Sequence, residues 1–164
     1  MIPMIFVETN DVNYADIMIG FYFGYHGDDS PFDGLFGMHA YSFPPEIGLL
    51  HLDGDELWVV DPDKLKFAFS TDLESMAIHE IGHVLGLGHS RIKSAVMYPT
   101  TPPNKRIVDL TKDDVNGLQQ LYEVNPNFKP GPNWESSSLE YSRGDKEFWL
   151  EHAFGDDSSL FFID

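Results

Sequence analysis

Apolar and polar positions alternate along the N-terminal part of the chain in a way that predicts short strands joined by a long loop. β-Branched and aromatic residues predict four strands: residues 2–7, residues 16–23, and short strands around His39 and His51. Residues 26–38, between the second and third of these strands, carry Gly, Asp and Pro and predict a loop.

A helix is predicted to begin at Thr71 or Asp72 and to run to about Leu85. Either side chain can accept a hydrogen bond from the free N–H groups of the first turn. Glu74 lies three residues after Thr71 and would complete a capping box. After this helix, three prolines make residues 90–108 irregular, because proline cannot continue a regular element.

A second capping signal lies further along the chain. Thr111 is followed three residues later by Asp114, which predicts a helix to about Tyr122. The chain of 164 residues is short enough for one domain. We therefore expect a folded domain at residues 1–124, followed by a linker and an unassigned acidic tail at residues 125–164.

The first helix carries the most informative motif of the sequence. His79 and His83 are four residues apart, so they share one helix face and can bind one metal ion together. Glu80 can reach a water on that metal without binding the metal itself. Gly86 can end the helix by taking a positive φ, after which the chain can return His89 as a third ligand. Three protein ligands leave one tetrahedral position open, which is typical of a catalytic zinc.

Two histidines four apart also occur on ordinary solvated helix faces, so the short pattern alone leaves both interpretations open. The extended pattern H-E-x-x-H-x-x-G-x-x-H fixes five positions and is named for the metzincin zinc peptidases. Ser90 follows the third histidine, and residues 94–99 around Met97 are similar to a Met-turn. With these features the chain resembles the matrixins, or matrix metalloproteinases, and is most similar to plant matrixins over about residues 5–124.

The resemblance implies an α+β fold of the metzincin (zincin-like) type. A twisted mixed β-sheet would pack on the zinc-binding helix, with a second helix at the C-terminal end. In the family, a strand and a long helix precede the segment that residues 5–8 resemble, and neither is matched here. We therefore expect an N-terminally truncated form with exposed apolar sheet surface. The segment from Asp33 to His39 is also shorter than is usual in the family, which should alter the nearby metal geometry and the substrate cleft.

A second, structural zinc site is implied upstream of the helix. Three nitrogens and one carboxylate, a complete tetrahedral set, would come from His26, Asp28, His39 and His51. Such a site would fix a long loop, because metal-binding energy becomes folding energy. Surface histidines, or buried ones satisfied by hydrogen bonds, are the alternative interpretation.

A calcium site is implied beside it. Hard oxygen ligands, which suit Ca²⁺, would come from Asp33, the carbonyl of Gly34, Asp53 and Glu56. Solvated loop carboxylates are the alternative interpretation of these residues.

The composition of the chain argues against some classes of binding partner and some kinds of chemistry. The net charge of −17, with only 10 Lys and Arg residues, argues against nucleic-acid binding. The chain has no Cys, and so no thiolate ligand or nucleophile and no cysteine that could occupy the open zinc position. No signal peptide is recognisable at the start, and no apolar run is long enough to span a membrane. The resemblance nevertheless implies a secreted, extracellular protein that acts as a monomer on protein or peptide substrates.

The function expected from these features is zinc-dependent endopeptidase activity on extracellular or cell-wall-associated proteins. Zinc would activate a water molecule, and Glu80 would be the general base. A catalytically impaired, metal-binding remnant of a matrixin is the main alternative, because the expected truncation could spoil the cleft. An acidic interaction module that uses the tail is a weaker alternative.

Overall fold

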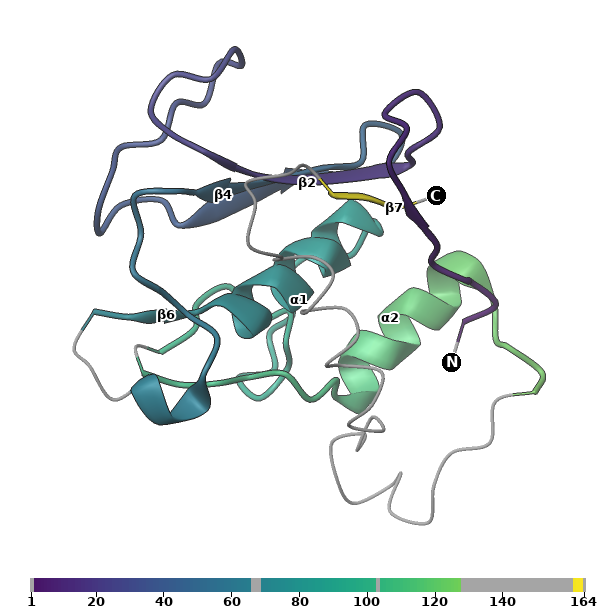
Figure 1. The fold of residues 1–164 in the computed structure, drawn as a ribbon. Coiled ribbons are helices and arrows are strands. Elements are labelled where there is room, and N and C mark those ends of the chain that lie inside the picture. Colours follow the sequence, from purple (N-terminus) through teal and green to yellow (C-terminus); the bar gives the residue numbers. More distant parts are fainter. Residues whose placement is uncertain (1, 66–68, 103, 128–160, 164) are drawn as a thin grey trace.

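A five-stranded mixed sheet forms one layer of the protein, and the helix α1 (Leu73–Val84) runs beneath it (Figure 1). The computed structural model describes residues 2–65, 69–102, 104–127 and 161–163. Across the sheet the strand order is β1-β7-β2-β4-β3. In chain order these strands are β1 (Glu8–Thr9), β2 (Ile17–Tyr22), β3 (Ala40–Phe43), β4 (Leu49–Asp53) and β7 (Phe161–Ile163).

The centre of the sheet is formed by β2 and β4, which pair in parallel. β3 pairs antiparallel with β4 and lies at the edge of the sheet. A second, two-stranded sheet is formed by β5 (Trp58–Val59) and β6 (Thr71–Asp72), and a short 3₁₀ helix at Pro62–Lys64 lies between these two strands in the sequence. The predicted α+β architecture with a mixed sheet over the metal-binding helix is confirmed.

Residue alternation gives β4 two different faces. Leu50 and Leu52 are fully buried and belong to the core between the sheet and the helices, together with Ile17, Ile19, Leu73, Val84, Leu85 and Leu118. Successive side chains of a strand point to opposite faces. His51 and Asp53 therefore point away from this core, yet both are buried. One strand thus contributes to the apolar core on one side and to a polar cluster on the other.

The first helix begins one residue later than the capping-box prediction requires. Asp72 is the N-cap, and its carboxylate accepts hydrogen bonds from the Ser75 N–H (2.8 Å) and hydroxyl (2.6 Å). Thr71 belongs to β6, and the side chain of Glu74 forms an ion pair with Arg106. The expected Thr71–Glu74 capping box is therefore wrong, because Thr71 pairs with Trp58 and Glu74 has a cationic partner.

The second helix, α2 (Lys112–Tyr122), begins as predicted. Thr111 is its N-cap, and Thr111 and Asp114 form a reciprocal capping box. The Tyr122 hydroxyl donates to the Leu85 carbonyl (2.8 Å), which ties the end of α2 to the end of α1. No helix in the described part of the chain is long and apolar enough to cross a membrane.

Two predictions concern the ends of the chain. The one at the N-terminal end is wrong, and the one at the C-terminal end falls mostly on residues that the structure does not describe. Residues 2–7 form no strand, and the strand of this region is the two-residue β1, because pairing with β7 decides where a strand forms. The expected tail lies mostly outside the described residues. Its last described segment, β7, inserts between β1 and β2, a pairing that the sequence did not indicate.

Candidate metal centres and active site

Three histidine rings converge at the end of α1. His79 and His83 project from the same face of the helix, and His89 follows the turn after it. The Nε2 atom of His83 lies 3.1 Å from Nε2 of His79 and 3.1 Å from Nε2 of His89. The structure therefore brings the three predicted catalytic ligands together as one group.

The second ring nitrogens of His79 and His83 show which nitrogen of each ring carries the hydrogen. Nδ1 of His79 lies 2.7 Å from the Val96 carbonyl, and Nδ1 of His83 lies 2.8 Å from the Leu87 carbonyl. A carbonyl can only accept, so each Nδ1 carries the hydrogen and each neutral ring keeps a lone pair at Nε2. Lone pairs that face one another need a cation between them. Backbone carbonyls on the remote nitrogen are also typical of metal-binding histidines. The donor set fits zinc.

The turn after α1 delivers the third histidine. Gly86 has φ +91°, which a residue with a Cβ rarely adopts, and the Leu87 N–H returns to the Gly82 carbonyl (2.9 Å). The pKa of His89 is lowered, first by partial burial and then by the neighbouring His83 and His79. A lowered pKa favours the neutral form, which is the form that binds metal.

Glu80 lies next to the triad on α1 and is buried, with 6% of its surface exposed. Its Oε2 accepts a 2.6 Å hydrogen bond from the hydroxyl of Ser42 on β3. Ser42 was not among the predicted site residues. No sequence signal could have found it, because the contact depends on how β3 lies against α1.

A buried methionine packs beneath the triad helix. A Cβ added at Gly82 would lie 2.3 Å from Sδ of Met97, so the helix and this side chain are in close contact. The backbone of Met97 is held from α2, where the Asp114 carboxylate accepts hydrogen bonds from the N–H groups of Val96 (3.1 Å) and Met97 (3.0 Å). Asp114 therefore does two tasks: it caps α2, and it fixes the loop under the metal site.

An open cleft of about 700 Å³ runs past the triad. One wall is formed by residues 37–42, which include most of β3, and the other by α1 and the turn after it. Glu80 and the three histidines all line this cleft. The site can therefore be reached from solvent, as a catalytic metal centre requires.

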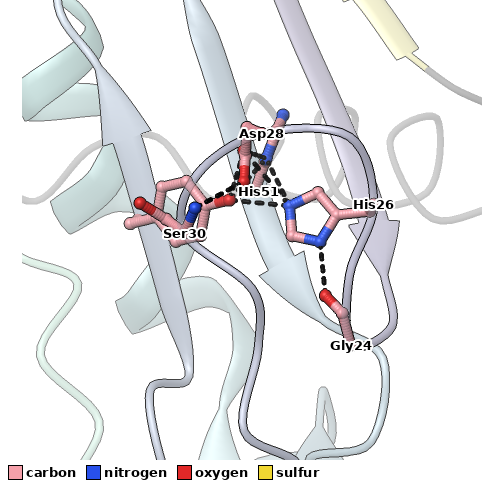
Figure 2. A network of polar contacts seen from close by, with 6 residues as sticks. Gly24, His26, Asp28, Ser30 and His51 are labelled. Atoms are coloured by element: carbon pink, nitrogen blue, oxygen red, sulfur yellow. Dashed lines mark hydrogen bonds and ion pairs between the residues drawn. The ribbon is translucent and has the colours of Figure 1, made fainter.

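A second cluster lies on the other face of β4 (Figure 2). His26 Nε2, His51 Nδ1 and Asp28 Oδ2 are each 3.2 Å from the other two. His26 Nδ1 lies 2.8 Å from the Gly24 carbonyl, which fixes the ring in the same manner as in the triad. Burial lowers the pKa of His51, which keeps this ring neutral. Two imidazoles and a carboxylate again fit zinc.

Tyr41 also belongs to this second cluster, although it was not among the predicted ligands. Its hydroxyl donates to Asp28 Oδ2 (2.5 Å) and lies 2.6 Å from His26 Nε2. Burial raises the pKa of the Tyr41 hydroxyl, and the hydrogen bond to Asp28 raises it further. The same hydrogen bond is the main cause that lowers the pKa of the Asp28 carboxyl.

His39, the fourth predicted ligand of this cluster, lies elsewhere. Its Nε2 is 3.6 Å from Oε2 of Glu56, and its ring meets Trp58 edge-on. Among the described residues, the structure groups His26 and His51 with Asp28 but not with His39. That His39 binds the structural zinc therefore stays a prediction.

Two of the predicted calcium ligands, Asp53 and Glu56, contact His39. Glu56 Oε1 accepts from the N–H groups of Phe36 (2.6 Å) and Gly37 (3.2 Å), whereas its Oε2 is buried without a hydrogen-bond partner. Oδ2 of the fully buried Asp53 also lacks such a partner. Asp33 accepts instead from the Met38 N–H (2.8 Å), and Gly34 has a positive φ of 83°. Buried carboxylate oxygens with free lone pairs suit a hard cation.

Comparison with known proteins agrees with this geometry. The family model for matrixin matches residues 1–123. The metalloendoproteinase 4-MMP of Arabidopsis thaliana is 57% identical over 128 residues, which cover 78% of this chain and 37% of that protein. Metalloendoproteinase 1 of Glycine max is 45% identical over 77% of this chain and 42% of its own length. Rat matrilysin is 46% identical over 66% of this chain and 40% of its own length.

The chain thus spans well under half the length of these curated relatives. The match nevertheless covers most of this chain, and it includes the helix and the turn that bring the three histidines together. By this match and by its histidine triad, the protein belongs to the matrixin family of metalloendopeptidases.

Proposed function

We propose that this chain hydrolyses peptide bonds with a zinc ion bound by His79, His83 and His89. The observation that carries the proposal is the convergence of their Nε2 atoms beside Glu80 in an open cleft. Zinc bound there would lower the pKa of a water molecule and polarise the scissile carbonyl. Family membership supports the same reaction class.

Glu80 would act as the general base and then as the general acid. Its carboxylate would accept the proton of the attacking water and later pass this proton to the leaving amine. The Ser42 hydroxyl holds one oxygen of Glu80 at 2.6 Å, which restricts the rotation of the carboxylate. A fixed carboxylate needs no reorientation when the substrate arrives.

The substrate would bind as an extended peptide along β3. This strand is the edge of the sheet, and residues 38–42 line the cleft opposite α1. Edge strands present backbone N–H and C=O groups that can pair with an added strand. We propose protein substrates outside the cell, such as cell-wall-associated proteins, and a monomeric enzyme. The support for both is resemblance to the family.

A peptide-cleavage assay with Glu80→Ala tests this proposal. The variant should bind zinc as the unchanged protein does, yet lose cleavage of a quenched fluorescent peptide by at least about a hundredfold. His79→Ala should lose both zinc and cleavage. In the unchanged protein, a chelator should abolish cleavage and added zinc should restore it. A protein that holds zinc at the triad but cleaves no peptide would be the metal-binding remnant instead.

We further propose that His26, Asp28 and His51 bind a second, structural zinc. The support is the equal spacing of their three ligand atoms and the burial of both rings, each with 7% of its side chain exposed. This zinc would join the loop at residues 24–32 to β4. We also propose Ca²⁺ near Asp53 and Glu56, where two buried carboxylate oxygens lack hydrogen-bond partners, with Asp33 and the Gly34 carbonyl as the remaining ligands.

A further inference from the structure

Part of the cleft wall comes from a segment that has no regular structure of its own. Pro99 and Thr101 line the cleft together with Met76 of α1. They belong to residues 98–102 and 104–107, which we call the wall segment and in which the structure shows no helix or strand. No ladder of backbone hydrogen bonds fixes these described residues, so contacts at the two ends of the segment must decide its position.

Both ends of the wall segment are held by contacts with the helices. At the first end, the Asp114 carboxylate of α2 accepts from the N–H of Met97 (3.0 Å), directly before the segment. At the second end, Nη1 of Arg106 lies 3.2 Å from Oδ2 of Asp72, and its Nη2 contacts Oε2 of Glu74. The segment therefore passes the first turn of α1 before the chain enters α2 (Figure 1).

The contacts of Arg106 join one cation to two buried carboxylates. The side chains of Asp72 and Glu74 are 0% and 5% exposed, and that of Arg106 is partly buried. Two buried carboxylates that meet at one guanidinium need its positive charge, because the positive end of the helix compensates only part of theirs. The planar guanidinium has a separate nitrogen for each carboxylate, a geometry that lysine cannot copy. Arg106 is therefore held more firmly than an arginine in an exposed ion pair.

A hydroxyl in the first turn of α1 holds the next residue of the wall segment. The Ser75 hydroxyl accepts a hydrogen bond from the N–H of Ile107 (2.8 Å) and donates one to Oδ1 of Asp72 (2.6 Å). Ser75 is buried, and Met76 follows it directly in the chain. The N-cap of α1 and the end of the wall segment thus share one polar network, directly before the helix residue that lines the cleft. This network keeps the two parts of the cleft wall at a fixed spacing.

We propose that Arg106 is a positioning residue that determines which substrate side chains the cleft accepts. This inference rests on the proposed peptidase function. Arg106 lies outside the set of described residues that line the cleft, so it acts through Pro99 and Thr101. With its two carboxylate partners it holds this part of the wall at a fixed distance from Met76. A wall that cannot yield discriminates between side chains by size, because a poor fit leaves a void or a clash.

The test is the selectivity of Arg106→Gln on quenched peptides that differ in one side chain, at each position on either side of the cleaved bond. At one position, the ratio of kcat/KM between a large apolar side chain and alanine should fall at least about tenfold, mainly through KM. The ratios at the other positions, and kcat on the best peptide, should stay within about threefold of those of the unchanged protein. Lys105→Gln, which removes the same charge from the neighbouring exposed residue, should keep every ratio.

Amide hydrogen exchange of the zinc-loaded protein measures the wall segment without any cleavage. In Arg106→Gln, exchange in residues 104–107 should be at least about tenfold faster, whereas exchange in β2 and β4 should not change. Arg106→Lys keeps the charge and should recover part of both effects. Ser75→Ala covers the case in which Arg106→Gln does not fold. It removes the acceptor for the Ile107 N–H but leaves the arginine in place, and it should lower the same kcat/KM ratio at least about threefold.

Two results would overturn the inference. An equal loss at every peptide position would mean that Arg106 contributes to stability alone. Unchanged ratios, with or without faster exchange, would mean that the wall segment does not select the substrate. Either result leaves the peptidase proposal standing, because both are measured on an unchanged protein that cleaves peptides. A zinc-loaded unchanged protein that cleaves none of the peptides would reject the peptidase proposal, and with it this role of Arg106.

Discussion

The hydroxyl of Ser42 on β3 donates a 2.6 Å hydrogen bond to Oε2 of Glu80 on α1. The contact joins the strand proposed to bind substrate to the proposed general base. Because Glu80 is buried, few other groups can satisfy this oxygen. The bond therefore links the position of the edge strand to the orientation of the carboxylate.

Ser42→Ala should reduce kcat about tenfold and change KM little, because the carboxylate loses its orientation while the backbone of β3 stays in place. Ser42→Thr keeps a hydroxyl and should recover most of the rate. The measurement is steady-state cleavage of a quenched peptide by both variants at full zinc occupancy. Equal kcat for Ser42→Ala and the unchanged protein would show that this bond does not position Glu80.

Gly82→Ala should destabilise the protein although alanine favours helices by about 1 kcal/mol over glycine. The added methyl group would lie 2.3 Å from Sδ of the buried Met97, and forced repacking of a core costs about 1–3 kcal/mol. Gly88→Ala is the matched control, because a Cβ there meets nothing within 4 Å. Thermal unfolding and zinc affinity of both variants check this. A higher Tm for Gly82→Ala would contradict the close packing of Met97.

Asp114→Ala should lower the free energy of unfolding by about 3–5 kcal/mol, because it leaves several buried N–H groups without an acceptor. The carboxylate is 2% exposed and accepts from the N–H groups of Val96, Met97 and Thr111. Asp113→Ala changes the neighbouring, exposed carboxylate, which accepts a hydrogen bond from the Ser90 hydroxyl, and should cost under about 1 kcal/mol. Urea unfolding of both variants measures the difference. Similar costs would mean that Asp114 does not hold the loop under the metal site.

Metal-free protein should lose stability as the pH falls through about 6.5, the ordinary pKa of histidine. Burial lowers the pKa of His51, so below this pH the unfolded chain binds a proton that the folded chain resists. Stability therefore rises with pH in this window and is fully present above it. The check is the Tm of chelator-treated protein across the window, with His51→Gln as the control that should reduce the dependence and leave the part due to His89, whose pKa is also lowered. A Tm that rises on acidification would give the opposite sign and reject the argument.

Calcium should raise the Tm of zinc-loaded protein, because binding to the folded state alone stabilises it. Glu56→Gln should remove most of this shift, since Oε2 of Glu56 is one of the two buried oxygens without a hydrogen-bond partner. Asp55→Asn, a change at the neighbouring acid that was not predicted as a ligand, should keep it. Thermal unfolding with and without added Ca²⁺ measures the shift. A shift that survives in Glu56→Gln would place the ion elsewhere.

The sequence by itself determined the features that depend on local spacing. The four-residue interval between His79 and His83, the glycine that ends the helix, and the Thr111–Asp114 capping box all act within a few residues, and each is found as predicted. Resemblance to the matrixins supplied the family and the α+β fold, and the comparisons confirm both.

Only the tertiary structure decided the contacts that depend on how strands pair. In the observed register Tyr41 lies opposite His51. His39 then lies beside Glu56, and Ser42 contacts Glu80. Likewise, β7 comes from the C-terminal end of the chain and lies between β1 and β2. Strand register and long-range pairing are set by the sum of many weak contacts across the sheet. No short stretch of sequence contains that sum.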